Sequence, residues 1–271
     1  MDEHDPGSPW RVRWMTASLD RPANIADDTA VFWSAVTGAN RSAPQGPRRE
    51  FMALVPVSGD ANLRVRRLGP APAGDAGPVA AQPVLLDLHS ADPAGLIAAA
   101  TGLGAVVADP PGDGRSALHS PGGLPLCVVG HHGECELPAP APLPGGAGRV
   151  RVDQLCLDVP SDRYDDEVRF WSALLDRRTG TSAGHPEFTV IRSRDLGFRL
   201  LIQRLDAADP RRPVTAHLDL ASDDVAATVR HHRRLGASAV SELPRWTVMT
   251  DPSGVPYCVT ARSVESGEPA P

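Results

Sequence analysis

The sequence contains no lysine, because all 27 residues counted as lysine or arginine are arginine. A chain without lysine can form no lysine Schiff base and has no lysine for a phosphate-binding P-loop. Long apolar runs are missing too, since the longest, such as 84–88 and 200–202, are as short as a single strand. We therefore expect neither lysine chemistry nor a membrane-spanning helix.

Cysteine and positive charge are also scarce. Four cysteines are too few for a disulfide scaffold in 271 residues, so we expect free thiols in a reducing compartment. The formal net charge of -6 gives no broad basic field for nucleic acid or an anionic membrane, and we expect neither partner. The acidic start "MDEHDPGSPW" does not have the pattern of a signal peptide, which predicts a cytoplasmic protein.

What the sequence does contain is a long internal repeat. Three landmarks recur in the same order, at offsets of 138, 132 and 131 residues. They are "FWSAVTG" (32–38) with "FWSALLD" (170–176), "LLDL" (85–88) with "HLDL" (217–220), and "SPGGLPLCV" (120–128) with "DPSGVPYCV" (251–259). Matches that keep their order predict a tandem duplication.

A Pro, Ala and Gly stretch, "ELPAPAPLPGGAG", separates the two copies and has little to bury, which is typical of a linker. The apolar content is sufficient to give each copy its own core. We predict an N-terminal tail at 1–10, a first domain at 11–130, a linker at 131–149, a second domain at 150–262 and a C-terminal tail at 263–271.

Periodicity in the second copy predicts strands and helices in turn. Residues 150–159 alternate as a strand with one polar face, and a helix follows, capped by Ser161 or Asp162. Helical spacing predicts that Trp171, like Trp33 in the first copy, packs in a core. A second unit follows, with a strand at 214–221, a helix over about 223–235 and a strand pair near 245–261.

This strand, helix, strands unit, together with "HLDL", "LGA" and "DPSGVPYCV" in that order, resembles the glyoxalase-like domains of the vicinal oxygen chelate superfamily. That superfamily includes glyoxalase, bleomycin-resistance proteins, extradiol dioxygenases and fosfomycin-resistance enzymes. The resemblance covers about 11–129 and 150–261. It implies an α+β fold with four βαβββ modules, in which two domains form a pseudo-dimer within one chain, as a monomer or a homodimer.

The resemblance also implies a place for a divalent metal. Members with chemistry hold one through side chains from the first and last strands of modules, where it chelates substrate oxygens. Carried over to the second domain, the ligand-binding candidates on strands are Gln154, Gln203, His217 and Cys258. Of these, His217, Gln154 and Cys258 are the metal candidates, for zinc, nickel, manganese or iron. Cys258 departs from the family pattern, which commonly has glutamate there.

The first copy offers no comparable donor set. Its matching positions are Thr16, Arg66, Leu85 and Cys127. The second domain is therefore where we expect a site.

Several roles stay open for these residues. His217 is either a ligand or an ordinary histidine of the cleft wall, and Cys258 is a ligand, a packing residue or a nucleophile with His217 as its base. Trp246 could stack on a flat ligand beside Arg245, or pack in the core. Arg199 could reach into the cleft or lie on its rim.

Two classes of function follow. The first expectation is a bleomycin-resistance-like protein that binds and sequesters a small organic molecule without metal. The alternative is a metal-dependent lyase, isomerase or dioxygenase with His217 as its candidate catalytic residue. Whether the protein is an enzyme stays open at this point, because fold does not fix activity.

Overall fold

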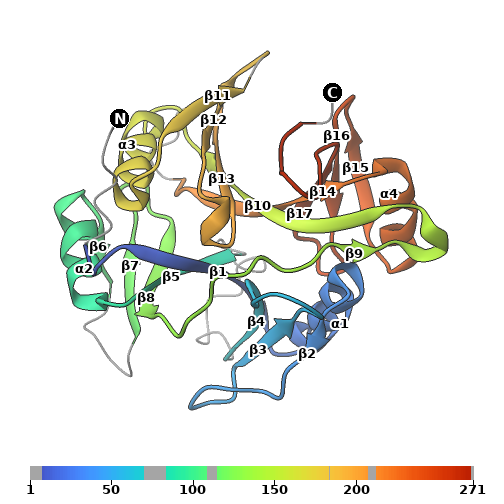
Figure 1. The fold of residues 1–271 in the computed structure, drawn as a ribbon, viewed down its shortest axis with the longest axis horizontal. Coiled ribbons are helices and arrows are strands. Elements are labelled where there is room, and N and C mark those ends of the chain that lie inside the picture. The colour runs from blue at the N-terminus through green and yellow to red at the C-terminus, as the bar shows by residue number, and fades with distance from the viewer. Residues whose placement is uncertain (1–7, 70–83, 109–114, 183, 207–211, 270–271) are drawn as a thin grey trace.

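The computed structural model describes residues 8–69, 84–108, 115–182, 184–206 and 212–269, which form two mixed β-sheets (Figure 1). The first sheet comes from the first half of the chain, in the strand order β2-β3-β4-β1-β5-β8-β7-β6. Its elements are β1 (Val12–Pro22), α1 (Ala26–Thr37), β2 (Asn40–Arg41), β3 (Phe51–Val55), β4 (Leu63–Leu68), β5 (Val84–Ser90), α2 (Pro93–Gly102), β6 (Val106–Val107), β7 (Arg115–His119) and β8 (Pro125–Gly130).

The second sheet repeats this arrangement in the order β11-β12-β13-β10-β14-β17-β16-β15, with β9 paired to β10. Its elements are β9 (Ala141–Pro142), η1 (Pro144–Gly146), β10 (Arg149–Val159), α3 (Tyr164–Leu175), β11 (Thr179–Ser182), β12 (His185–Ile191), η2 (Arg194–Leu196), β13 (Arg199–Arg204), β14 (Thr215–Ser222), α4 (Val225–Arg234), β15 (Ser238–Glu242), β16 (Trp246–Thr250) and β17 (Pro256–Thr260). Each sheet thus contains two βαβββ modules, and the predicted fold class is confirmed.

Strand register makes the two sheets comparable residue by residue. Thr16 lies opposite Asp87 in the first sheet, as Gln154 lies opposite Asp219 in the second. The same comparison along the other strands defines equivalent positions in the two sheets. These are Asp20 and Asp158, Phe51 and Phe188, Arg64 and Leu201, Arg66 and Gln203, Leu85 and His217, Asp87 and Asp219, Arg115 and Trp246, and Cys127 and Cys258.

The helices pack as their apolar spacing predicts, but one cap differs. Trp33 and Trp171 are both buried, as predicted. Helix α3 begins at Tyr164 after Arg163 and has no side-chain cap, so the predicted cap at Ser161 or Asp162 is wrong. The chain continues in a turn through these residues before it becomes helical. None of the helices in the described ranges is long and apolar enough to cross a membrane.

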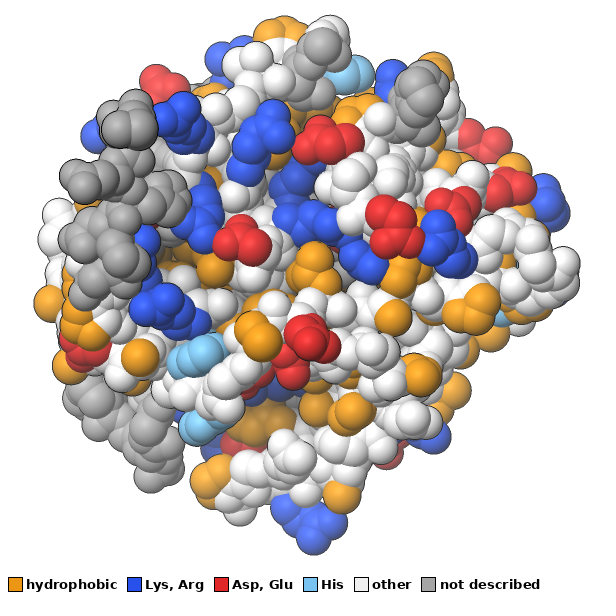
Figure 2. Space-filling view, viewed as in Figure 1, with side chains coloured by type: hydrophobic (Ala, Val, Ile, Leu, Met, Phe, Trp, Pro, Cys, Tyr) orange, Lys and Arg blue, Asp and Glu red, His pale blue; other side chains and the backbone are white. Residues whose placement is uncertain are grey.

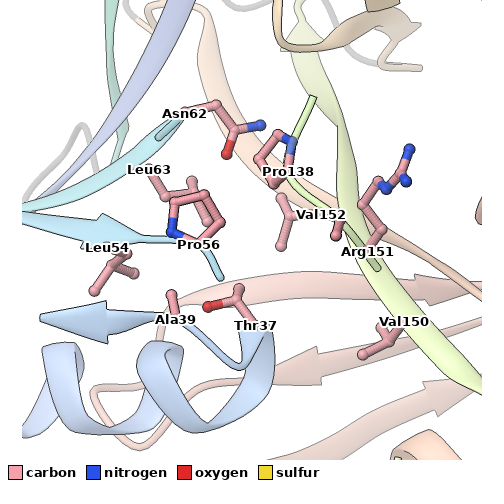
Figure 3. Close-up of a pocket in the computed structure, with 11 residues that line it drawn as sticks. Thr37, Ala39, Leu54, Pro56, Asn62, Leu63, Pro138, Val150, Arg151 and Val152 are labelled. Carbon is pink, nitrogen blue, oxygen red and sulfur yellow. The ribbon is translucent and has the colours of Figure 1, made fainter. Parts of the chain in front are cut away.

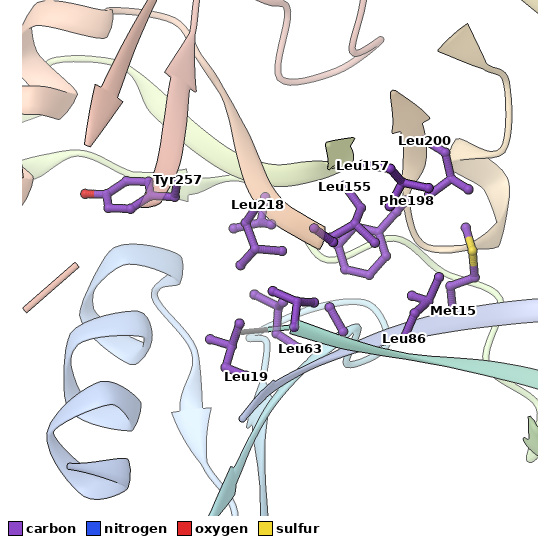
Figure 4. Packing of buried hydrophobic residues seen from close by; sticks show 14 of the residues in the cluster. Met15, Leu19, Leu63, Leu86, Leu155, Leu157, Phe198, Leu200, Leu218 and Tyr257 are labelled. Atoms are coloured by element: carbon purple, nitrogen blue, oxygen red, sulfur yellow. The ribbon is translucent and has the colours of Figure 1, made fainter. Parts of the chain in front are cut away.

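The two sheets share one hydrophobic core. Leu19 and Leu86 of the first sheet face Leu155 and Leu218 of the second in a single cluster (Figure 4). Separate cores were expected for the two copies, and that expectation is wrong, because the apolar face of each sheet is buried against the other. Each half therefore depends on its partner for burial.

A buried ion pair joins the halves at one end of this interface. Arg21 of β1 lies 3.1 Å from Asp251, in the turn before β17, and both side chains are almost fully buried. The Trp33 indole also donates to Asp251 over 3.2 Å. At the matching place in the other half, Ser120 donates to Glu167 of α3 over 2.7 Å. The repeated helices thus bind the turn of the opposite copy.

The segments expected at the edges of the domains are more ordered than their composition suggests. Within the predicted linker, Ala141 pairs with Val150, and both Ala141 and Leu143 are buried. In the expected C-terminal tail, Val264 is buried and Pro269 pairs with Arg262 in a β-bridge. Residues 1–7 and 270–271 lie outside the described residues.

Candidate functional site

The second sheet has one face in the core and lines a cavity of about 390 Å³ with the other. Strand alternation produces this division: Leu218 and Leu220 enter the core, and His217 and Asp219, which alternate with them, face the cavity. All the predicted ligand-binding residues lie in its wall. They are Gln154, Gln203, His217, Arg245, Trp246 and Cys258.

His217 lies between two carboxylates. Its Nδ1 is 2.9 Å from Asp158 Oδ2, and its Nε2 is 3.4 Å from Asp219 Oδ1. Burial by itself lowers a histidine pKa, but the nearby Cys156 and the two facing carboxylates outweigh it and raise the pKa of His217 well above its ordinary value. His217 therefore holds its proton more tightly than a free imidazole.

Asp219 has one satisfied and one unsatisfied oxygen. Its Oδ2 accepts a hydrogen bond from the Gln154 amide, whereas Oδ1 is buried and has no hydrogen-bond partner in the described part of the chain. Burial acts to raise the pKa of Asp219, but the positive charges of His217 and Arg262 outweigh it and lower the pKa. The result is a buried carboxylate that keeps its charge through an ion pair with His217.

Two thiols flank this cluster. Cys258 Sγ lies 3.7 Å from His217 Nε2, and Cys156 Sγ donates to Gln203 Oε1 over 3.7 Å. Burial raises the pKa of both thiols, and the charge of Asp219 raises that of Cys258 further. The predicted closeness of Cys258 and His217 is present, but an activated nucleophile needs a lowered thiol pKa.

The donor set fits a divalent metal. His217, Asp219 and Cys258 offer one nitrogen, one oxygen and one sulfur within 4.8 Å of one another, and Cys156, Asp158 and His217 form a second such set. The first set contains the unsatisfied Asp219 Oδ1. A bond from Nδ1 to Asp158 would leave Nε2 of His217 as the ligand atom, as in the carboxylate-histidine pairs of metal sites.

Sequence reasoning missed the two carboxylates. Asp158 and Asp219 lie in the cavity wall, yet only Gln154 was considered among the metal candidates as the partner of His217 and Cys258. The signal was present, because Asp219 follows His217 by two residues and so shares its strand face. Gln154 is not in either set of close donors, and instead its amide donates a hydrogen bond to the carboxylate of Asp219.

Aromatic side chains form another part of the wall. His185 and Phe188 stack with ring centroids 5.3 Å apart, and Trp246 meets both of them edge to face. Trp246 is half-buried and belongs to this wall rather than to the shared core. Arg199 and Arg245 line the same cavity.

The matching face of the first sheet is filled by ion pairs. Arg64 and Arg115 both bind Asp87, and both guanidinium groups lie over the Phe51 ring. Cys127 packs with Leu85 in a small apolar cluster. In the described part of the chain, sets of three close donors occur on the second sheet and not on this one.

A smaller crevice lies between the halves, where Leu54 and Leu63 face Val150 and Val152 (Figure 3). Its volume of about 20 Å³ is enough for about one water molecule, so it does not compete with the cavity of the second sheet as a ligand site.

Comparison with known proteins gives both a family match and similar folds. The family model described as glyoxalase-like domain matches residues 17–129 and 154–260. No curated protein sequence matches the chain. Among solved structures, the Mn(II)-bound glyoxalase from Novosphingobium aromaticivorans is similar with a TM-score of 0.59 at 15% identity, over 92% of this chain and 81% of that one.

Two further enzyme structures are similar to about the same extent. A mutant of 4-hydroxymandelate synthase from Streptomyces coelicolor has a TM-score of 0.57 at 16% identity, over 96% of both chains. The halotolerant catechol dioxygenase BphC has a TM-score of 0.57 at 14% identity, over 93% of this chain and 87% of that one. At such low identity these similarities establish the fold and leave the activity to be argued from the site.

Proposed function

Because the chain belongs to the glyoxalase-like domain family of the vicinal oxygen chelate superfamily, we propose that the cavity of its second sheet is the site of a metal-dependent enzyme acting on a small organic molecule. The observation that carries this proposal is the buried, unsatisfied Asp219 Oδ1 beside His217 Nε2 and Cys258 Sγ. Its nearest cationic partner is now His217 at 3.4 Å, and a metal would take over that role once Nε2 of His217 becomes a ligand. The neighbouring folds of a Mn(II)-bound glyoxalase and of dioxygenases support the same proposal.

The residues divide the work as follows. His217, Asp219 and Cys258 would hold the metal, which when bound supplies Lewis-acid activation of adjacent substrate oxygens. Asp158 keeps the proton at Nδ1 of His217, and Gln154 orients Asp219 through its second oxygen. A thiolate among the ligands favours zinc over manganese, because zinc is the softer ion. The reaction class we infer is that of a lyase, isomerase or dioxygenase of this superfamily.

Metal content tests the proposal. Untagged protein is incubated in turn with zinc, nickel, manganese and iron(II), dialysed, and measured by elemental analysis beside His217→Ala and His185→Ala. We expect about one metal ion per chain, lost in His217→Ala and kept in His185→Ala, because His185 lines the cavity without joining the donor cluster. Wild-type protein that retains no metal, or equal retention in all three proteins, contradicts the proposal.

One observation favours a second function, the binding of a small molecule without metal. Both ring nitrogens of His217 already face carboxylates, so the protein itself supplies a cationic partner to Asp158 and Asp219. A cavity with an aromatic wall can bind a ligand on that basis. Absence of metal from the wild-type protein in the experiment above would favour this sequestration function.

A further inference from the structure

One arginine in the cavity wall is not fully matched by the protein. Arg199 donates from Nη1 to the carbonyl of Gly267 over 2.8 Å, but its Nε is buried with no hydrogen-bond partner among the described residues. Among the described residues it forms an ion pair with Glu268, whose carboxylate oxygen is 3.8 Å away on a side chain that is half exposed. A buried guanidinium that has an N–H without a hydrogen-bond acceptor and only a distant counter-ion is suited to bind an anionic ligand.

Its neighbour Arg262 shows the contrast. Arg262 makes two bonds, of 2.7 and 3.1 Å, to the buried Asp153 carboxylate, so its charge is matched within the protein. Burial and the adjacent charge of Arg262 lower the pKa of Arg199, and the charges of Glu268, Asp153 and Asp219 offset this only in part. Figure 2 shows basic side chains gathered in the upper half of the view.

The segment after β17 brings the present partners of Arg199. Residues 263–269 fold back so that the Gly267 carbonyl and the Glu268 carboxylate approach this arginine, and Pro269 joins the cavity wall. Figure 1 shows this segment close to β16, between it and the β11–β12 arm. Glu268 is divided between two arginines, because it also lies 3.3 Å from the exposed Arg192. It is thus a weak substitute for a dedicated counter-ion.

The aromatic wall defines the rest of the ligand. His185, Phe188 and Trp246 present ring faces and edges to the cavity that also contains Arg199. Such rings favour a flat apolar body through stacking and edge contacts. The same cavity therefore offers one surface for a ring and one guanidinium for an anion.

We propose that the ligand of this cavity is a planar aromatic carboxylate, and that Arg199 binds its carboxylate in place of Glu268. This rests on the proposed function only in taking the cavity of the second sheet as the ligand site. Arg199 would then determine specificity for an acid over its neutral analogue, since a charge-assisted hydrogen bond is stronger than a neutral one.

The test compares benzoate with benzamide by calorimetric titration into chelator-treated protein. We expect benzoate to bind about tenfold or more tightly than benzamide in the wild type, and the preference to disappear in Arg199→Gln. Arg192→Gln is the matched control: it contacts the same Glu268 from outside the cavity, so it should keep the preference. Glu268→Gln should bind benzoate a few-fold more tightly, because it removes the competing carboxylate.

Two results would overturn the proposal. One is equal binding of benzoate and benzamide to the wild type. The other is a preference that survives in Arg199→Gln but is lost in His217→Gln, which would assign the anion to the His217 cluster. Should Arg199→Gln not fold, the response to Glu268→Gln decides instead, and unchanged benzoate binding there counts against the proposal. Because the titrations use metal-free protein, their outcome does not depend on whether the elemental analysis finds a bound metal.

Discussion

The two sheets have the same register but carry different chemistry at equivalent carboxylates. Asp87 in the first sheet is held by the guanidinium groups of Arg64 and Arg115, whereas Asp219 in the second faces the imidazole of His217. Arginine cannot lose its charge under ordinary conditions, so Asp87 is permanently neutralised. Imidazole can give up a proton and become a ligand. One duplicated position has therefore become structural in one copy and open to chemistry in the other.

The same substitutions decide how much space each face leaves. In the first sheet, the guanidinium groups of Arg64 and Arg115 lie 4.2 and 5.0 Å from the centre of the Phe51 ring. In the second, Leu201 occupies the position of Arg64, and both Leu201 and the equivalent Phe188 border the cavity. The difference shows how side-chain length, on an unchanged backbone, opens or closes a site.

The largest effect is expected from exchanging the residues that distinguish the two faces. His217→Leu gives the second sheet the residue of the first, and we expect metal affinity to fall by more than about 100-fold, which exceeds the usual cost of losing a residue that only orients a ligand. The reverse exchange, Leu85→His, should gain no metal, because Asp87 stays bound to two arginines. Calorimetric titration with zinc measures the affinity of both variants. Metal binding gained in Leu85→His would refute the explanation that the arginines bound to Asp87 prevent a site in the first sheet.

The next effect concerns the two ends of the interface between halves. Asp251→Ala leaves Arg21 as a buried charge without its counter-ion and should cost about 3–5 kcal/mol of unfolding free energy. At the other end, Glu167→Gln leaves no buried charge without a counter-ion and weakens hydrogen bonds from Ser120, Gly122 and Trp171, so it should cost less, about 1–2 kcal/mol. Urea denaturation followed by circular dichroism gives both values. Equal losses would mean that the two ends are energetically alike.

Acid stability should separate the halves as well. His232 is buried, where Ala100 is the equivalent residue in the first half, and burial lowers its pKa to about 3. Below pH 6.5, His232 takes up a proton in the unfolded chain, whereas in the folded chain it stays neutral down to about pH 3. Unfolding free energy should therefore fall by about 1.4 kcal/mol for each pH unit in that window.

The variant His232→Gln should remove that slope, since glutamine can accept the hydrogen bond from Tyr257 and does not titrate. Urea unfolding at pH 7, 5.5 and 4.5 measures the slope. His231→Gln, on the neighbouring and more exposed histidine, is the control and should keep most of it. An unchanged slope in His232→Gln would show that other groups cause the acid sensitivity.

The smallest effect should be the same in both halves. Asp92 caps α2 through the Gly95 N–H, and Asp224 caps α4 through the Ala227 N–H. Replacing either aspartate with alanine should cost about 1 kcal/mol. Thermal unfolding of the two variants compares them directly, and a difference of more than about twofold would show that the second modules have diverged in stability as well as in chemistry.

Much of this architecture could be predicted from local patterns. The repeat of ordered landmarks predicted a tandem duplication, the family resemblance implied four modules, and strand alternation predicted that His217 and Cys258 face away from the core. Asp219 shares the face of His217 by the same rule, but its role depends on an oxygen left unsatisfied by its neighbours. That state follows from contacts of Gln154 and Arg262 across several strands, which a linear pattern does not contain.

The sequence by itself determined which face of each strand is polar and which half retains a histidine, because both follow from residue type and a period of two. Tertiary structure alone decided that the halves share one core, that Arg21 meets Asp251 across 230 residues, and that residues 263–269 return to Arg199. These depend on how two sheets are placed against each other. That placement is set by the summed burial of both apolar faces and by no local signal in either copy.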